Sequence, residues 1–118
     1  MTEEQADTDL PPFLRWGNYK SGDENNPDIL ELKVLETETF ETEYSVNVGI
    51  LIKDGSEWIE VILPLKSHTS NNASLLKQWT INVKNGKLKA GKQFKLKTWL
   101  GTSKRTQRPI RRFVIEFG

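Results

Sequence analysis

The sequence predicts an all-β domain, a five-stranded antiparallel barrel with one short helix between strands three and four. Its 118 residues suit a single domain with a core of its own. Five short segments alternate apolar and polar residues, which is the period of a half-buried strand. Segments rich in Gly, Asn and Pro separate them, as expected of turns. One segment between the third and fourth strands has helical spacing instead.

The first 28 residues are predicted to form an acidic tail and an arm, partly disordered, ahead of a domain spanning residues 29–118. The tail, Met1–Asp9, consists mainly of small, polar and acidic residues, a composition that is typical of disordered segments. In the arm, Phe13, Trp16 and Tyr19 recur every three residues. They form either a short helix or an irregular segment laid against the barrel. Their rings either cap the open end of the core or add a stacking contact for a ligand.

The first three strands are predicted at Ile29–Glu36, Tyr44–Lys53 and Glu57–Leu65. Asp54–Gly55 is a hairpin turn signal between the second and third. On the second strand the pattern directs Tyr44, Val46, Val48, Ile50 and Ile52 to the core, and Ser45, Asn47, Gly49, Leu51 and Lys53 outward. On the third it directs Ile59, Val61, Leu63 and Leu65 inward, so that an outer apolar patch forms from Leu51, Trp58 and Ile62.

The helix is predicted at Ala73–Trp79 or slightly beyond, with Ser70, Asn71 or Asn72 as its N-terminal cap. Trp79 is expected in the core, because a short helix must bury its apolar stripe to persist. The following Asn85–Gly86 pair is expected to form a turn, such as the tip of a small hairpin.

The last two strands are predicted at Lys92–Leu100 and Ile110–Phe117, joined by the loop Gly101–Pro109. On the fourth strand Phe94, Leu96 and Leu100 share one face, and Lys95, Lys97 and Trp99 the other. A bulge at Thr98 would instead turn Trp99 into the core. The loop adds Lys104, Arg105 and Arg108, and the fifth strand carries Arg111 and Arg112 directly after Ile110.

Charge is strongly segregated along the chain. Residues 1–65 hold four cations and 15 acids, whereas residues 66–118 hold 13 cations and only Glu116 as an acid; the net charge is +1. Such segregation suggests a basic surface for an acidic partner. The alternative is that the two halves neutralise each other across adjacent strands.

Several classes of function find no support in the sequence. Without cysteine there is no disulfide framework, thiolate metal site or cysteine nucleophile, which fits a cytoplasmic protein. No apolar run approaches the length of a membrane span. The single histidine, His68, lies in a polar loop with no partner pattern for catalysis or metal binding, and no phosphate-cradling glycine motif occurs. We therefore expect no enzymatic activity, no cofactor and no metal.

The order and pattern of these segments resemble the OB-fold family of single-stranded nucleic-acid-binding proteins, including the domains of single-strand DNA-binding proteins and replication protein A. The resemblance covers about residues 29–117, and the segments that carry it are ILELKVLE (29–36), YSVNVGILI (44–52), EWIEVILPL (57–65), LLKQW (75–79), LKAGKQFKLKTWLG (88–101) and RRFVIEF (111–117). It implies a ligand lying across the second and third strands, flanked by the loops after strands one and four.

The expected function is therefore binding of single-stranded nucleic acid, most readily DNA, with little sequence preference. The cations would hold phosphates and the tryptophans would stack bases. The residues expected to bind are Asn47, Lys53, Trp58, Lys95, Lys97, Trp99, Lys104, Arg105, Arg108 and Arg112. One departure is the acidic loop Glu36–Glu43, which should repel phosphate. The rival expectation is an interaction subunit that oligomerises, or meets a partner protein, through Leu51, Trp58 and Ile62.

Overall fold

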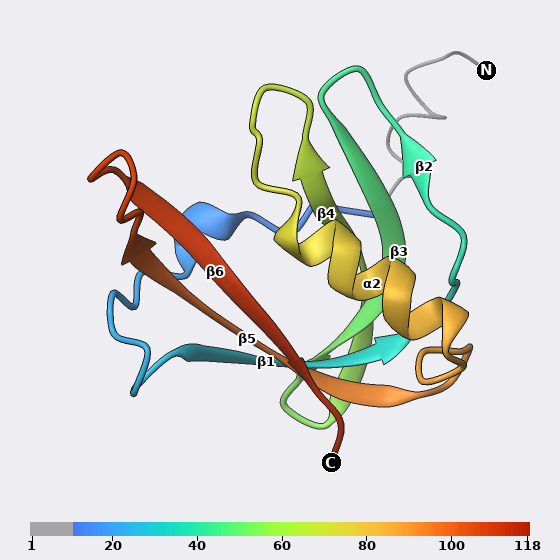
Figure 1. The fold of residues 1–118 in the computed structure, drawn as a ribbon. Coiled ribbons are helices and arrows are strands. Elements are labelled where there is room, and N and C mark those ends of the chain that lie inside the picture. Colours follow the sequence, from blue (N-terminus) through green and yellow to red (C-terminus); the bar gives the residue numbers. More distant parts are fainter. Residues whose placement is uncertain (1–10) are drawn as a thin grey trace, which may run out of the picture.

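The computed structural model describes residues 11–118, so the predicted acidic tail, Met1–Asp9, lies outside the described residues. Figure 1 shows a strongly bent sheet with one α-helix across its open side. In chain order the elements are the 3₁₀ turn η1 (Trp16–Asn18), β1 (Asp28–Val34), β2 (Phe40–Glu41), β3 (Ser45–Asp54), β4 (Glu57–Ser67), α2 (Ser74–Lys84), β5 (Gln93–Thr102) and β6 (Pro109–Glu116).

All named strand pairs are antiparallel, which confirms the all-β class. The sheet has the order β2-β3-β1-β5-β6, and β4 pairs with the other side of β3. It contains six strands rather than five, because Phe40 and Glu41 pair with Asn47 and Val46. The sheet is not closed: within residues 11–118, β4 and β6 do not pair with each other.

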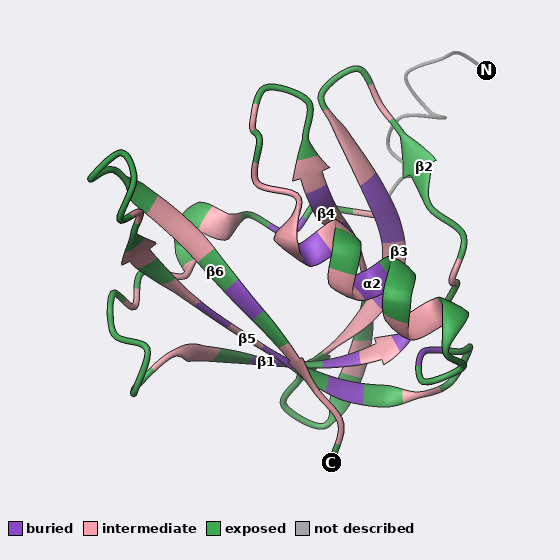
Figure 2. Ribbon diagram, in the orientation of Figure 1, coloured by how far each residue is buried: buried purple, intermediate pink, exposed green. Residues whose placement is uncertain are grey.

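The core is built from the inward faces of these strands. Alternation places Leu30, Leu32 and Val34 of β1 inside, and β5 contributes Phe94 and Leu96 in the same way. Figure 2 shows the buried stretches of the strands and of α2 gathered toward the middle of the molecule. The remaining buried apolar side chains of this cluster are Leu14, Val48, Ile50, Leu63, Leu65, Leu75, Trp79, Leu88 and Phe113.

The β3–β4 hairpin turns where the sequence predicts it. Asp54 pairs with Glu57, and Gly55 has φ +65°, a left-handed conformation that glycine adopts without steric cost. The other end departs from the prediction. The β3–β4 register shifts between Val46 and Asn47, and β3 begins at Ser45. Tyr44 therefore precedes the strand and is 73% exposed, not in the core as its alternation suggested.

Helix α2 is longer than predicted, because Ser74–Lys84 extends beyond Trp79. Trp79 is 1% exposed, as expected of a core residue. Asn85–Gly86 ends this helix and does not form a hairpin tip. Gly86 has φ +78°, and the amides of Gly86 and Lys87 donate to the carbonyls of Val83 and Asn82. This is the Schellman arrangement, in which glycine ends a helix by adopting a left-handed conformation.

Side chains of α2 and the preceding loop cover the outer edge of β6. The Gln78 amide nitrogen donates to the Phe113 carbonyl at 2.8 Å, and its oxygen accepts from the Ile115 amide at 3.0 Å. Asn72 Nδ2 donates to the Arg111 carbonyl at 2.8 Å. These contacts replace the ladder bonds that a neighbouring strand would make.

The N-terminal arm covers the outer edge of β4. The Leu14 amide donates to the Ile62 carbonyl, and the Ile62 amide donates to the Pro12 carbonyl, both at 2.8 Å. Further along, the Trp16 indole nitrogen donates to the Pro64 carbonyl at 3.3 Å, and its ring packs edge-on against Phe113 at 4.9 Å. The arm therefore bridges the gap between β4 and β6. It combines the two predicted alternatives, because it is irregular apart from the 3₁₀ turn η1.

Arg111 holds the arm to the sheet. Its guanidinium donates to the carbonyls of Trp16 and Tyr19 at 3.0 and 2.8 Å, and to the Thr98 hydroxyl at 3.1 Å.

In the described part of the chain, no helix has the length and apolar character needed to cross a membrane.

Candidate nucleic-acid interface

The outward face of β5 carries the predicted row of Lys95, Lys97 and Trp99. The inward positions, Phe94, Leu96 and Thr98, are all buried, and Thr98 is fully enclosed. Pairing with β6 runs without a register shift from Lys95 to Thr102, so the bulge that would turn Trp99 inward is not present. Trp99 is half-buried on the outer face, on the same side as the two lysines.

Arg112 lies directly beside Trp99 on this face. The two residues are register partners across β5 and β6. The Arg112 side chain extends over Gly101: a Cβ added at Gly101 would lie 3.4 Å from Arg112 Cγ and 3.5 Å from its Nε. Arg112 is exposed, so an aromatic ring and an exposed cationic side chain adjoin on this face.

The loop after β5 presents the next three cations. Lys104, Arg105 and Arg108 are all exposed. The loop is internally bonded, because the Ser103 amide donates to the Arg108 carbonyl and the Gln107 amide donates to the Ser103 carbonyl, each at 2.8 Å. Trp99, Arg112 and this loop all lie at the same end of the β5–β6 hairpin, and we call them together the hairpin-end surface.

The other end of the same face is largely neutralised. Lys97 forms an ion pair with Glu116 at 2.8 Å, and Lys95 is the register partner of both Glu31 and Glu116. The Lys95–Glu31 pairing joins the basic and acidic halves of the chain, whereas the Lys97–Glu116 ion pair lies within the basic half. Within residues 11–118, the cations of the hairpin-end surface form no ion pair. The acidic segment that carries Asp23, Glu24 and Asp28 nevertheless runs beside the same end of β5, because the Leu100 amide donates to the Ser21 carbonyl at 2.8 Å and Asp28 is the register partner of Thr98.

Trp58 and Lys53 lie on β4 and β3, near the turn that joins these strands. They are register partners, and Lys33 of β1 places its Nζ 4.4 Å from the centre of the Trp58 ring. A cleft of about 310 Å³ adjoins them, and its walls include Glu31, Gln93 and Lys95. The cation occupies one face of the indole, so Trp58 has less free ring surface than its outward position suggested.

The structure places two of the predicted residues out of reach of a ligand. Asn47 is 0% exposed, and its side-chain amide is bonded to the Ser45 hydroxyl at 2.7 Å and to the Ser45 carbonyl at 3.1 Å. Ile62 is 4% exposed, at the point where the arm pairs with β4. Asn47 is therefore no ligand contact, and the expected Leu51–Trp58–Ile62 patch loses one of its three members.

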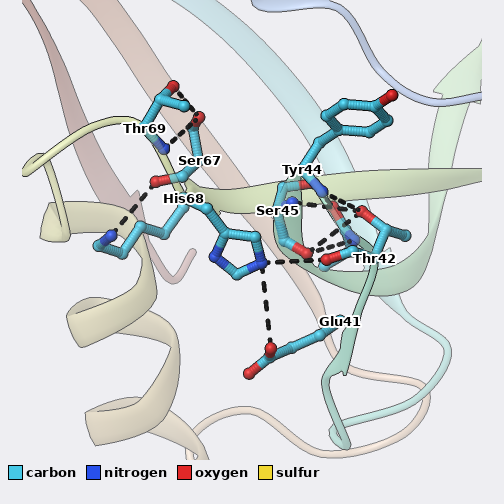
Figure 3. Close-up of polar contacts among 9 residues, drawn as sticks. Glu41, Thr42, Tyr44, Ser45, Ser67, His68 and Thr69 are labelled. Carbon is cyan, nitrogen blue, oxygen red and sulfur yellow. Dashed lines mark hydrogen bonds and ion pairs between the residues drawn. The ribbon is translucent and has the colours of Figure 1, made fainter.

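The acidic loop before β3 is tied to the end of β4 by His68. Its Nε2 lies 3.0 Å from the Thr42 carbonyl and 3.9 Å from the Glu41 carboxylate. Figure 3 shows the Glu41 side chain beside the imidazole and the Tyr44 ring on the opposite side of the cluster. This loop therefore directs one of its acids toward His68, and the single histidine has a structural partner.

Lys33 and Arg111 were not among the predicted site residues. Lys33 is placed over Trp58 by the β1–β3 and β3–β4 registers, which no local pattern encodes. Arg111 is inward-facing, and burial lowers its pKa, while Asp28 opposes that effect. Burial, followed by the charge of Asp28, raises the pKa of Tyr19, whose carbonyl accepts from Arg111.

The structure thus brings together Trp99, Arg112 and the loop cations, keeps Lys95 and Lys97 on the same face beside acids, and sets Lys53 and Trp58 at its far end. Within residues 11–118, no group of three His, Cys, Asp or Glu side chains could hold a metal ion. No protein-family model, curated protein or solved structure matches this chain.

Proposed function

We propose that this chain is a non-enzymatic protein that binds single-stranded nucleic acid, most readily DNA, with little sequence preference. The observation that carries the proposal is the hairpin-end surface. There Trp99 and Arg112 adjoin on one face, and three exposed cations follow in the next loop. Cations that track a phosphate backbone beside an aromatic ring for base stacking form the general arrangement of single-strand binding sites.

We also propose that the sheet is a variant of the OB-fold. In this assignment β1, β3, β4, β5 and β6 are its five strands, and β2 is an addition. The antiparallel pairings β1–β3, β3–β4, β1–β5 and β5–β6 support it. So does a helix that follows β4 and covers the edge of β6. The N-terminal arm would occupy the gap that remains between β4 and β6.

Each part of the surface has a distinct physical role in the proposal. Lys104, Arg105, Arg108 and Arg112 would contact phosphates, releasing counterions and making the affinity depend on salt. Trp99 would stack on a base, which requires a base that is free of its duplex neighbours. Lys97 would contribute less charge, because Glu116 lies 2.8 Å away.

The proposal is tested by titrating an unlabelled oligonucleotide into the protein while recording tryptophan fluorescence. Single strands should quench the emission, duplex DNA of the same sequence should quench it far less, and salt should weaken the effect. Replacing Lys104, Arg105 and Arg108 with Gln should reduce the slope of log K against log salt by about 2, since each phosphate contact contributes about 0.7.

A matched control replaces three exposed lysines away from the surface: Lys77, Lys84 and Lys87. This variant loses the same charge and should keep the wild-type salt slope. An equal fall in slope for both triple variants would show a diffuse charge effect rather than a local interface. Absence of any quenching by single strands at low salt would refute the proposed function.

A further inference from the structure

A second, unassigned surface begins where the hairpin-end surface stops. It is a cleft of about 430 Å³ between the loop after β5 and the loop that precedes α2, which we call the polar cleft because most of its lining residues are polar, although Pro109 and Ile110 also line it. Its walls include Arg108, Ser103 and Thr106 on one side and Ser70 and Asn71 on the other. Hydroxyls, an amide and a guanidinium are suitable donors for phosphate oxygens.

The cleft adjoins a second pocket, in the gap between β4 and β6, which we call the seam pocket. It has a volume of about 380 Å³ and shares Ser70 and Asn72 with the polar cleft. Its walls include the rings of Trp16, Tyr44 and Phe113 and the cations Lys66 and Arg111. None of the described residues that line either cavity is acidic. Aromatic residues beside positive charge suit a nucleotide, whose flat neutral base can stack on a ring while its phosphate contacts a cation.

The backbone on each side of this path is held in place. Ser70 Oγ accepts from the Asn72 amide at 3.0 Å, and Ser103 Oγ accepts from the amides of Arg105 and Thr106. Tyr44 is fixed similarly, because its carbonyl accepts from the His68 amide at 2.9 Å and its amide donates to Thr42 Oγ1 at 3.2 Å. The Tyr44 ring is 73% exposed and points away from Glu41 in Figure 3.

We propose that a bound single strand continues from Trp99 around the loop Ser103–Arg108, through the polar cleft, and places a base in the seam pocket against Tyr44. This inference rests on the proposed function. The Arg111 guanidinium already donates to the carbonyls of Trp16 and Tyr19, so Arg108 and Lys66 are the cations that contact phosphate on this path. The path ends at Tyr44, because the preceding residue, Glu43, is exposed and would repel the next phosphate.

The test compares strands of two lengths on the full chain. An oligothymidylate of about four nucleotides and one of about twelve bracket the site sizes typical of single domains. The double variant Lys66→Gln, Tyr44→Ala should lower the affinity for the longer strand about tenfold and leave the affinity for the shorter strand unchanged. The control double variant Lys77→Gln, Ile81→Ala alters an exposed cation and an exposed apolar residue of α2, and should bind both strands as the wild type does.

A second measurement needs no variant. In the wild-type protein the indole N–H resonance of Trp16 should shift on addition of the longer strand and stay in place with the shorter one. The Trp99 resonance should shift with both. Suppose that the Lys66→Gln, Tyr44→Ala variant and the control variant bind the longer strand equally, and that the Trp16 resonance does not shift. The inference is then overturned, while the proposed function stands. If the wild type binds neither strand at low salt, both fail.

Discussion

At the scale of single residues, the interface depends on which side chains keep a free surface. Trp99 and Trp58 both face outward, but Lys33 lies 4.4 Å from the centre of the Trp58 ring. Trp99 has the exposed Arg112 beside it, and Arg112 lies along Gly101 rather than across the indole. Trp99 is therefore the better stacking platform, and Trp58 is a secondary contact at the other end of the face.

Replacement of Trp99 with Ala should weaken single-strand binding about 5- to 150-fold, because a stacked base contributes about 1–3 kcal/mol. Trp58→Ala should cost less, since that ring is already covered on one face. The dissociation constants of both variants can be measured by anisotropy of a labelled oligonucleotide, with Trp99→Phe as the variant that retains a ring. A larger loss for Trp58→Ala than for Trp99→Ala would place the centre of the interface near the β3–β4 turn.

At the scale of secondary-structure elements, α2 acts as a substitute for a strand. Its buried face, with Leu75 and Trp79, packs into the core, while Gln78 bonds the edge of β6. A helix cannot extend a ladder of hydrogen bonds, so one side-chain amide serves the Phe113 carbonyl and the Ile115 amide together. This contact fixes β6, and through β6 it fixes the position of Arg112 beside Trp99.

Gln78→Leu should lower the free energy of unfolding by at least about 2 kcal/mol, because it leaves a backbone carbonyl and a backbone amide without partners. Gln78→Glu should fall between wild type and Gln78→Leu, since a carboxylate can accept from Ile115 but cannot donate to Phe113. Urea denaturation measures these differences. Lys77→Leu, at the exposed neighbouring position, should change stability by less than about 0.5 kcal/mol, and an equal loss for both leucine variants would contradict the bridging role.

At the scale of the whole molecule, the open sheet is completed by segments that are not strands. The arm lies along β4, the side chains of Asn72 and Gln78 lie along β6, and Arg111 joins the arm to the sheet. These segments occupy part of the gap between β4 and β6, and the seam pocket lies in the part that they leave open. The contact between the arm and the sheet depends on ionisation, because Tyr19 and Arg111 are partly buried and both are influenced by the charge of Asp28.

Burial and the charge of Asp28 raise the pKa of Tyr19 above its ordinary value of 10.0 in the folded state. The folded state therefore holds this proton more tightly than the unfolded state does. The resulting stabilisation is fully present below the unfolded pKa and is lost as pH rises through the folded pKa. Between about pH 9 and about pH 11, the stability of the wild type relative to Tyr19→Phe should fall.

Urea denaturation at the two pH values measures this change. The exposed Tyr44 supplies the control: the stability of the wild type relative to Tyr44→Phe should change less over the same interval. If the difference in free energy of unfolding between the wild type and Tyr19→Phe does not change with pH, Tyr19 does not contribute to alkaline unfolding.

The sequence by itself determined much of the architecture and the composition of the candidate site. Alternation located both ends of β1, β3, β4, β5 and β6 to within two residues, and it placed Lys95, Lys97 and Trp99 on one face. These features are local, since strand direction and the two-residue period decide them. The absence of acids between Lys66 and Ile115 is likewise a property of the chain alone.

Only the tertiary structure decided what covers each surface. Asn47 and Ile62 have outward alternation, yet one is enclosed and bonded to Ser45, and the other lies where the arm pairs with β4. Lys33 reaches Trp58, and Glu116 reaches Lys97, through pairings between strands that are distant in sequence. Coverage and charge compensation are non-local, because they depend on which strands become neighbours. That is why the candidate interface contracts to Trp99, Arg112 and the loop that follows β5.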